Sequence, residues 1–445
     1  MKKIVFSLNF CLFFFFTFSQ TIPETIDELL KVYSRQNAFN GTALVAQHGQ
    51  VMFAKGYGLR NFERHLPNDT STIYQIGSIS KQFTSAIILQ LRDKGLLSLN
   101  DKLSKFIPDY PRGDEITIEH LLSHTSGIYN YTNDEQFMKS RSVKPISRED
   151  LISEFKNKPL DFDPGKKYNY SNSGYVLLGY IIENITGKSY FDVVKENIFN
   201  PLQMDHSGFD FIGLKSRAKA VEYSKLSPNL AEPAMIVDST VSFAAGSIYT
   251  SAGDLYKWDR ALNSGFLPDS SLKQAYTTRL DHYGLGWVID TSYGKKVVMH
   301  EGGIFGFGSF IARIPEDQST IILFDNHSAA NLARIAENIN AILNDQPYEF
   351  PRYRKEISLD SNMLHQYEGE YKFAPDFVIT IKPSDGHLVV QAKGQGQNEF
   401  FAASPDFFFT KIIEMQLEFI RDTNGKITRL NLYQGGQQIQ GVKIK

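Results

Sequence analysis

The sequence predicts an α+β protein, in which a mainly antiparallel sheet is flanked by helices and is followed by a small all-β domain. Apolar strand patterns stand near both ends of residues 21–346, for example at Thr42–Ala46 and Ser319–Phe324. Apolar helical segments fill the stretch between them. From about Leu359 the pattern changes to short strands separated by turns. We therefore expect an α/β sandwich whose sheet is assembled from both ends of the first domain.

The chain has 445 residues, which exceeds the size of one ordinary compact core. We predict a processing segment at 1–20, a large α/β domain at 21–346, a linker at 347–358 and a small β-barrel-like domain at 359–445. The linker is polar and aromatic and contains Pro347 and Pro351.

Composition excludes several classes of function. The formal net charge of -2 provides no basic field for nucleic acid. The only cysteine is Cys11, so neither a disulfide framework nor a cysteine-based zinc site is possible. No metal-ligand cluster is evident, and we expect no metal and no cofactor.

The first 20 residues have the pattern of a secretory signal. Lys2 and Lys3 precede the apolar run Ile4–Phe18, which is shorter than the roughly 20 residues needed to cross a bilayer. We predict an exported protein, periplasmic or extracellular. The alternative is an uncleaved N-terminal anchor, and only in that case do we expect contact with a membrane.

Helices are predicted from apolar periodicity and capping signals. Ser251 should cap one of them, with Asp254 completing a capping box. The other predicted helices are Thr25–Gln36, Lys81–Lys94, Gly174–Asn184 and a segment from Leu332 to Leu343.

Strands are predicted where apolar runs or alternation lie between turn residues. In the first domain these are Thr42–Ala46, Val51–Ala54, Tyr283–Ile289, Lys296–His300, Ser309–Ile314 and Ser319–Phe324. In the second domain they are Phe377–Lys382, His387–Ala392, Glu399–Phe401, Phe407–Thr410, Gln416–Ile420 and Ile427–Tyr433.

The first chemical motif is Ser78-Ile79-Ser80-Lys81, at the start of an apolar helix. Residues three apart on a helix share a face, so an amine at Lys81 can reach the Ser78 hydroxyl. A desolvated lysine with a lowered pKa could accept the serine proton. Ser-x-x-Lys also occurs elsewhere, for example at Ser153, but only Ser78 directly precedes a long apolar helix.

The second motif is Tyr170-Ser171-Asn172, in a loop that leads into a core helix. A tyrosine near two cations can become a phenolate and transfer protons, and an asparagine can hold a substrate amide. Tyr131-Thr132-Asn133 has the same pattern. We favour Tyr170 because the following helix can fix its position.

The third motif is His300-Glu301-Gly302-Gly303, at the end of a late strand. The strand edge could pair with an extended substrate, and the N–H groups of Gly303 and Ser78 could form an oxyanion hole. Phe305 and Phe307 are the best candidates for a wall that faces the substrate.

These three elements, in this order, resemble the serine β-lactamase and penicillin-binding protein superfamily. Within it the chain is most similar to the class C β-lactamase and DD-carboxypeptidase/esterase branch, whose second motif is Tyr-x-Asn. Further similar stretches are Ile116–Gly127, Ala244–Ser247 and Tyr283–Trp287. The resemblance covers about residues 25–345.

The resemblance implies a role for each motif residue. Ser78 would be the nucleophile and Lys81 its general-base partner, and Tyr170 would protonate the leaving group and activate the deacylating water. Asn172 would contact the acyl-side amide. His300 would help bind a carboxylate or tune Tyr170, while Gly302 and Gly303 would contribute to substrate binding.

One departure bears on the substrate. Class C β-lactamases usually carry lysine in the third motif, where this chain has His300. An imidazole is a weaker carboxylate anchor near pH 7. The leading hypothesis is therefore a serine acyl hydrolase that acts on D-amino-acid peptides, small amides or esters, including peptidoglycan-derived peptides. The alternatives are a true β-lactamase and a catalytically inactive binder of cell-wall peptides.

Overall fold

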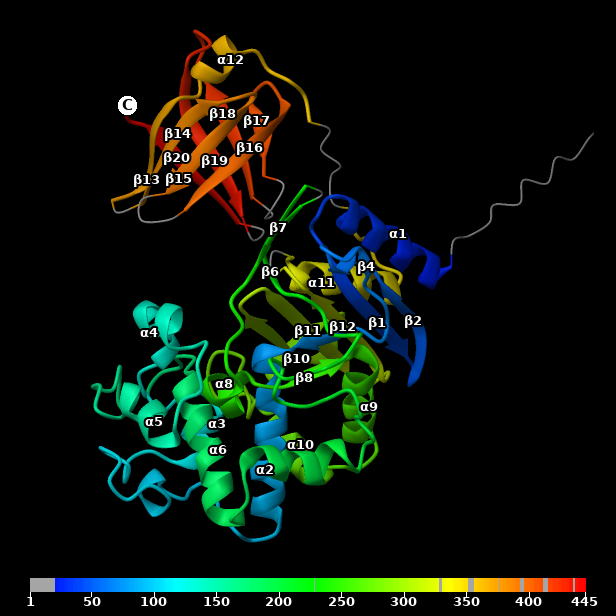
Figure 1. The fold of residues 1–445 in the computed structure, drawn as a ribbon, viewed down its shortest axis with the longest axis vertical. Helices are drawn as coiled ribbons and strands as arrows, with labels where there is room; N and C mark the ends of the chain where they lie inside the picture. The colour runs from blue at the N-terminus through cyan, green and yellow to red at the C-terminus, as the bar shows by residue number, and fades with distance from the viewer. Residues whose placement is uncertain are drawn as a thin grey trace, which may run out of the picture.

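The protein is represented by a computed structural model, and Figure 1 shows its fold. The structure describes residues 21–227, 229–327, 330–350, 356–375, 377–392, 396–410, 415–434 and 437–445. The predicted signal at 1–20 lies outside these residues. Within them, no helix has the length and apolar character needed to cross a membrane.

A six-stranded antiparallel sheet forms the centre of the α/β unit, in the order β2-β1-β12-β11-β10-β9. The early strand β1 pairs with the late strand β12, where Leu44 lies opposite Ile322. The predicted sheet, assembled from both ends of the unit, is therefore confirmed. The strands are β1 Gly41–Gln47, β2 Gln50–Gly56, β9 Val288–Ser292, β10 Lys295–Ile304, β11 Phe307–Ile314 and β12 Ser319–Asp325.

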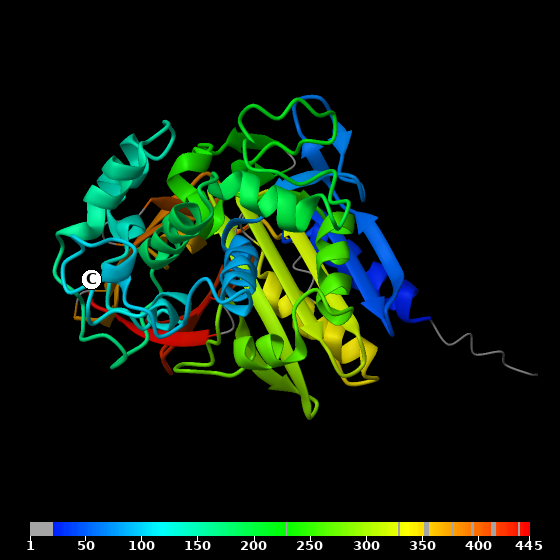
Figure 2. The same ribbon diagram turned by 90° about the horizontal axis from the view of Figure 1, so that it is seen from below.

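Helices cover both faces of this sheet, as Figure 2 shows. Alternate residues of a strand point to opposite faces. In β12, Ile321 and Leu323 pack with α1 and α11, whereas Ile322 and Phe324 join the larger core beneath α2 and α9. The strand is therefore buried on both sides.

The helices predicted for the α/β unit are present and begin within a few residues of the predicted positions, whereas its other helices were not predicted. The N-cap of α1 is Thr21, which makes a capping box with Glu24. The helices are α1 Ile22–Arg35, α2 Ser80–Asp93, α3 Ile118–Leu122, α4 Glu135–Ser140, α5 Arg148–Lys156, α6 Asn172–Thr186, α7 Tyr190–Val194, α8 Ser239–Gly246, α9 Ala252–Asn263, α10 Asp269–Ala275 and α11 Leu332–Leu343.

Short strand pairs and tight turns complete this unit. β5 pairs with β8 beside the start of α2, and this pairing fixes the segment that leads into that helix. The short strands are β3 Leu59–Asn61, β4 Leu66–Pro67, β5 Ile73–Gln75, β6 Tyr223–Ser227, β7 Leu230–Pro233 and β8 Tyr249–Ser251. The tight turns are η1 Gly77–Ile79, η2 Leu103–Lys105, η3 Tyr131–Asn133 and the π-helical turn η4 Lys195–Phe199.

Two local predictions are wrong. Tyr283–Ile289 is not a strand over its length, because Gly284 N–H donates to the Trp287 carbonyl at 2.8 Å and closes a turn there. The strand β9 begins only at Val288. Ser251 does cap α9, but Asp254 does not complete a capping box in the structure: its carboxylate accepts from the backbone N–H of His206 at 2.7 Å.

The C-terminal unit is a closed barrel of antiparallel strands that follow one another in sequence from β13 to β20. β13 closes the barrel against β20 at Tyr371 and Lys443. Neither strand was predicted from the sequence. The elements are α12 Ser361–His365, β13 Gly369–Ala374, β14 Phe377–Ser384, β15 His387–Ala392, β16 Gln397–Ser404, β17 Phe407–Phe409, β18 Met415–Arg421, β19 Ile427–Gln434 and β20 Gln437–Lys443.

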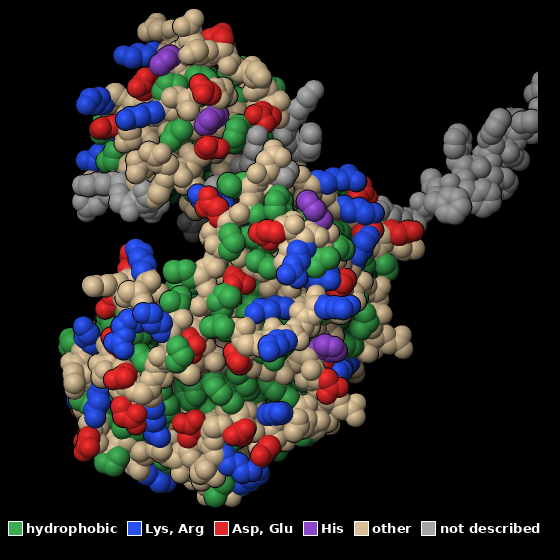
Figure 3. Space-filling view, in the orientation of Figure 1, with side chains coloured by type: hydrophobic (Ala, Val, Ile, Leu, Met, Phe, Trp, Pro, Cys, Tyr) green, Lys and Arg blue, Asp and Glu red, His purple; other side chains and the backbone are tan. Residues whose placement is uncertain are grey.

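Charged side chains of both signs are interspersed on the face of the molecule shown in Figure 3. This mixture agrees with the formal net charge of -2. The surface on this face therefore carries no extended field of one sign.

A buried ion pair attaches α9 to the sheet. Arg313 Nε on β11 donates to Asp259 Oδ1 on α9 at 2.9 Å, and both side chains are almost completely buried. Thr320 Oγ1 donates to the second carboxylate oxygen at 2.7 Å. The pair thus couples the helix to two adjacent strands.

We predict that Asp259→Ala lowers the free energy of unfolding by about 3–5 kcal/mol, because it leaves the buried Arg313 charge without its carboxylate partner. Denaturation followed by tryptophan fluorescence measures this, since the chain has two tryptophans and Trp258 and Trp287 both lie in the core of the α/β unit. The control is Glu135→Ala, which removes an exposed ion pair to Lys139 and should cost less than about 1 kcal/mol. Equal effects of the two substitutions would contradict the prediction.

Candidate active site

Ser78 lies where an extended segment turns into a helix. The strand β5 ends at Gln75, Ser78 sits in the tight turn η1, and α2 begins at Ser80. This position places the hydroxyl beside backbone N–H groups at the start of α2, where developing negative charge is stabilised.

Lys81 lies in the first turn of α2 and is fully buried. Its Nζ is 3.0 Å from Ser78 Oγ, 2.8 Å from Asn172 Oδ1 and 2.8 Å from the carbonyl oxygen of Ala245. Burial holds the pKa of Lys81 well below its ordinary value. A neutral amine has two N–H groups, and the two amide oxygens can only accept. Its lone pair is therefore directed at the Ser78 hydroxyl, as a general base requires.

Asn172 is held in the orientation that this network needs. Its Nδ2 donates to Thr132 Oγ1 at 3.0 Å, and Thr132 Oγ1 donates in turn to Asn130 Oδ1 at 3.1 Å. Asn130 Oδ1 also accepts from the backbone N–H of Asn172 at 3.0 Å. Because the amide nitrogen is committed to Thr132, the amide oxygen faces Lys81.

The third partner of Lys81 comes from a break inside α8. Phe243 has φ 35° and ψ -133°, a conformation that costs a non-glycine residue about 1–3 kcal/mol. The carbonyls that follow it face α2: Ala244 O accepts from Thr84 Oγ1 at 2.6 Å, and Ala245 O accepts from Lys81. These carbonyls lie in the last turn of α8, where they have no partner within the helix, and the break turns them toward α2.

Tyr170 lies near Ser78, whose side chain acts to lower the pKa of Tyr170. Its ring centroid lies 4.8 Å from Lys81 Nζ and 4.1 Å from the centroid of the His124 ring. Burial raises the pKa of Tyr170. The phenolate considered from the sequence is therefore disfavoured, because burial lowers the pKa of Lys81 and no cation is kept beside the ring. Tyr170 is a protonated group that can donate.

His300 is buried on β10, and both of its ring nitrogens have partners within the protein. Nδ1 lies 2.6 Å from the Glu301 carbonyl oxygen and must donate to it, so Nε2 accepts from the Tyr283 hydroxyl at 2.8 Å. Burial lowers the pKa of His300 from 6.5 to about 3. In this structure the imidazole is neutral and is not available as a carboxylate ligand, in contrast to one of the roles expected from the resemblance.

Gly302 and Gly303 bring β10 against the segment that carries Ser78. A Cβ on Gly302 would lie 2.0 Å from the Ile76 carbonyl oxygen, and one on Gly77 would lie 2.9 Å from Gly303 N. Gly77 also has φ 47°. Only glycine allows this approach, which brings the backbones of Ser78 and Gly303 to the same cavity.

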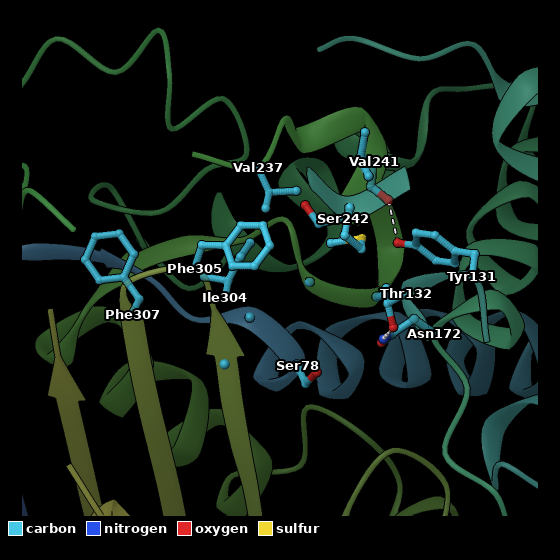
Figure 4. A pocket seen from close by; sticks show the side chains of 15 residues that line it. Ser78, Tyr131, Thr132, Asn172, Val237, Val241, Ser242, Ile304, Phe305 and Phe307 are labelled. Carbon is cyan, nitrogen blue, oxygen red and sulfur yellow. Dashed lines mark hydrogen bonds between the residues drawn. The ribbon is translucent and has the colours of Figure 1, made fainter. Parts of the chain in front are cut away.

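Ser78 opens into a cavity of about 380 Å³. Figure 4 shows Val237, Ile304 and Phe305 on one side of it, and Tyr131, Thr132 and Asn172 on the other. Phe305 and Phe307, expected as a wall, both line the cavity. Among the described residues that line it, none is Lys, Arg, His, Asp or Glu.

Several residues at the site did not stand out in the sequence. Tyr131 and Thr132 line the cavity, although their Tyr-x-Asn pattern was set aside in favour of Tyr170. His124 accepts the backbone N–H of Ser171 at 3.1 Å and so holds the loop that carries Tyr170. Ala245 lies in the similar stretch Ala244–Ser247, but the sequence did not indicate that its backbone carbonyl accepts from Lys81. In the described part of the chain, no group of three or more acidic, His or Cys side chains could hold a metal ion.

A serine hydroxyl that faces a buried amine, with a tyrosine beside it, is the arrangement expected of a serine acyl hydrolase. The comparisons with known proteins agree with this class. Residues 24–344 match the family described as Beta-lactamase. The chain belongs to this family, and the resemblance to β-lactamases and penicillin-binding proteins is confirmed. Residues 353–443 match a domain of unknown function, DUF3471.

Similar proteins support the family assignment, and two of them match this chain over almost its whole length. Penicillin-binding protein 4* of Bacillus subtilis (strain 168) is 28% identical over 96% of this chain and 98% of its own length. The octameric penicillin-binding protein homologue from Pyrococcus abyssi has a TM-score of 0.67 and 25% identity, over 94% of this chain and 99% of that one. A D-stereospecific amidohydrolase from Streptomyces sp. has a TM-score of 0.61 and 28% identity, over 71% and 99%.

The neutral state of His300 predicts a dependence of stability on pH. Its pKa is about 3 in the folded protein and 6.5 for an ordinary histidine, so between these values only the unfolded chain binds the proton. The free energy of unfolding is fully maintained above pH 6.5 and should fall by about 1.4 kcal/mol per pH unit below it for this one group. Denaturation curves at pH 5 and pH 7 measure the slope.

The substitution His300→Gln should remove this part of the slope, because glutamine has no proton to take up. His206→Gln, at an exposed histidine, is the control for loss of a histidine from the surface. An unchanged slope in His300→Gln would show that His300 does not stay neutral.

Proposed function

We propose that this protein is an exported serine acyl hydrolase that works through an acyl-enzyme on D-amino-acid peptides, small amides or esters. The observation that carries the proposal is the hydrogen bond between Lys81 Nζ and Ser78 Oγ, with the other two contacts of Nζ made by oxygens that can only accept. The similarity to a D-stereospecific amidohydrolase supports an amide among the substrates.

The proposed reaction begins when Lys81 removes the Ser78 proton and Ser78 Oγ attacks the substrate carbonyl carbon. The backbone N–H groups of Ser78 and Gly303 stabilise the oxyanion. The bond to the leaving group breaks, and Tyr170, protonated in the free enzyme, gives its proton to the departing alcohol or amine. Water then hydrolyses the Ser78 ester: the Tyr170 phenolate accepts a proton from the water, Lys81 returns its proton to Ser78 Oγ, and a carboxylic acid is released.

The decisive test combines p-nitrophenyl esters with a fluorophosphonate that labels activated serines. Ser78→Ala should abolish both ester hydrolysis and labelling, and mass spectrometry should find the label on the Ser78 peptide. Lys81→Ala should lower kcat/KM about 100- to 10,000-fold through loss of the general base.

The chain offers a matched control for this test. Ser153 and Lys156 repeat the Ser-x-x-Lys spacing on α5, where Ser153 is exposed. Ser153→Ala should hydrolyse esters and take up the label as the wild type does. Labelling that persists in Ser78→Ala would refute the assignment of the nucleophile.

The alternatives have distinct outcomes in the same panel. Rapid turnover of a chromogenic cephalosporin would indicate a true β-lactamase. Binding of D-Ala-D-Ala peptides with neither turnover nor labelling would indicate an inactive binder. The buried Lys81 and its contact with Ser78 favour an active enzyme over the binder.

The proposal that the protein is exported is based on the apolar segment Ile4–Phe18, which follows Lys2 and Lys3. We predict that the secreted protein lacks about the first 20 residues. Intact-mass measurement of protein from the periplasm or the medium tests this, with the cytoplasmic precursor as the control. Detection of the full 445-residue chain outside the cytoplasm would favour an uncleaved anchor.

A further inference from the structure

The cavity at Ser78 combines apolar walls with an absence of charge. Its walls include Val237, Val241, Ile304, Phe305 and Phe307. Its volume of about 380 Å³ lies near the lower end of the range of about 300–1,000 Å³ for small-molecule sites. An apolar group of a small substrate would gain from leaving water here.

Two basic side chains at the site, Lys81 and His300, are not available to an anion. Lys81 uses Nζ for three contacts within the protein and is fully buried. His300 donates Nδ1–H to a carbonyl and accepts at Nε2 from Tyr283. Neither side chain therefore has an N–H group left to offer to a substrate carboxylate.

The hydroxyl groups in the cavity are committed in the same way. Thr132 Oγ1 donates to Asn130 Oδ1, and Ser242 Oγ donates to the Asp238 carbonyl at 3.4 Å. A carboxylate that entered the cavity would lose its hydration and would find no cation to replace it. Burial of an uncompensated charge is costly, whereas an ester or amide without charge avoids that cost.

We infer that the site selects uncharged substrates: esters or amides with an apolar group for the cavity and no ionised carboxylate near the scissile bond. This inference rests on the proposed function and specifies its substrate class. It separates this enzyme from one that recognises the free C-terminus of a peptide. The reaction itself creates a carboxylate, because water adds to the Ser78 ester and releases an acid, so the same absence of cations favours product release.

Matched substrate pairs test the inference. On the acyl side, p-nitrophenyl pentanoate is compared with the mono-p-nitrophenyl ester of glutaric acid, which has a carboxylate at the end of an acyl chain of the same number of carbons. On the leaving-group side, acetyl-D-Ala-D-Ala amide is compared with the free acid. We expect kcat/KM to be at least about tenfold higher for the uncharged member of the ester pair and of the peptide pair.

A charge introduced into the wall should reverse the preference. Phe305→Lys places an ammonium at the cavity and should raise the ratio of kcat/KM for the charged ester to that for the uncharged ester by about tenfold or more. Phe305→Met is the matched control, because it makes a similar change of shape without charge and should leave the ratio near that of the wild type.

Binding of boronic acids, which add to an activated serine, gives a readout that needs no turnover. Butylboronic acid should bind more tightly than 3-carboxypropylboronic acid, and Ser78→Ala should bind neither. The inference would be overturned if the charged ester were hydrolysed as well as or better than the uncharged one and the charged boronic acid bound as tightly or more tightly. In that case the inactivity of Ser78→Ala would still support the proposed function. If no substrate is hydrolysed and no boronic acid or fluorophosphonate reacts at Ser78, the proposed function itself fails.

Discussion

The burial of Lys81 in the first turn of α2 is the constraint on which the rest of the site depends. An amine removed from water favours its neutral form, and burial lowers the pKa of Lys81 accordingly. Such a group is tolerated only where its N–H groups find acceptors. Asn172 and Ala245 provide these acceptors from two other helices. The hydrogen bonds of Lys81 Nζ thus connect α2 to the start of α6 and to the end of α8.

The contact between α8 and Lys81 is accompanied by a strained backbone at Phe243. Its backbone lies in a region that is unfavourable for a side chain, and it persists because the ring is packed against Tyr180 and Tyr190, with centroids 4.7 and 5.1 Å away. Hydrophobic packing therefore offsets backbone strain, and the strain directs two carbonyls toward α2. The break thus supplies one of the acceptors that hold Lys81 Nζ beside Ser78.

The neutrality of the site extends beyond Lys81. The aromatic side chains at the site include Tyr170, Tyr283, His124 and His300. Burial shifts the pKa of each in the direction that favours its neutral form. A site of this kind stabilises charge mainly through backbone N–H groups, and only when charge develops during the reaction. It provides no charged side chain to stabilise a substrate that is already ionised. The burial that keeps the catalytic residues neutral therefore also favours uncharged substrates.

The sequence by itself determined the fold class and the main elements, because apolar periodicity and capping follow from local burial and backbone geometry. It also determined the motif residues Ser78, Lys81, Tyr170 and Asn172, whose spacing along helix starts is a local property. Only the tertiary structure decided the protonation state of His300. One of its hydrogen-bond partners is the Glu301 carbonyl, and the other is the hydroxyl of Tyr283, which lies in a loop where the sequence had predicted a strand. The tertiary structure alone showed that the backbone carbonyl of Ala245 accepts from Lys81, because a backbone contact cannot be read from a pattern of side chains. The charge and the accessibility of a group depend on what is packed around it, and that is set by contacts between segments distant in the chain.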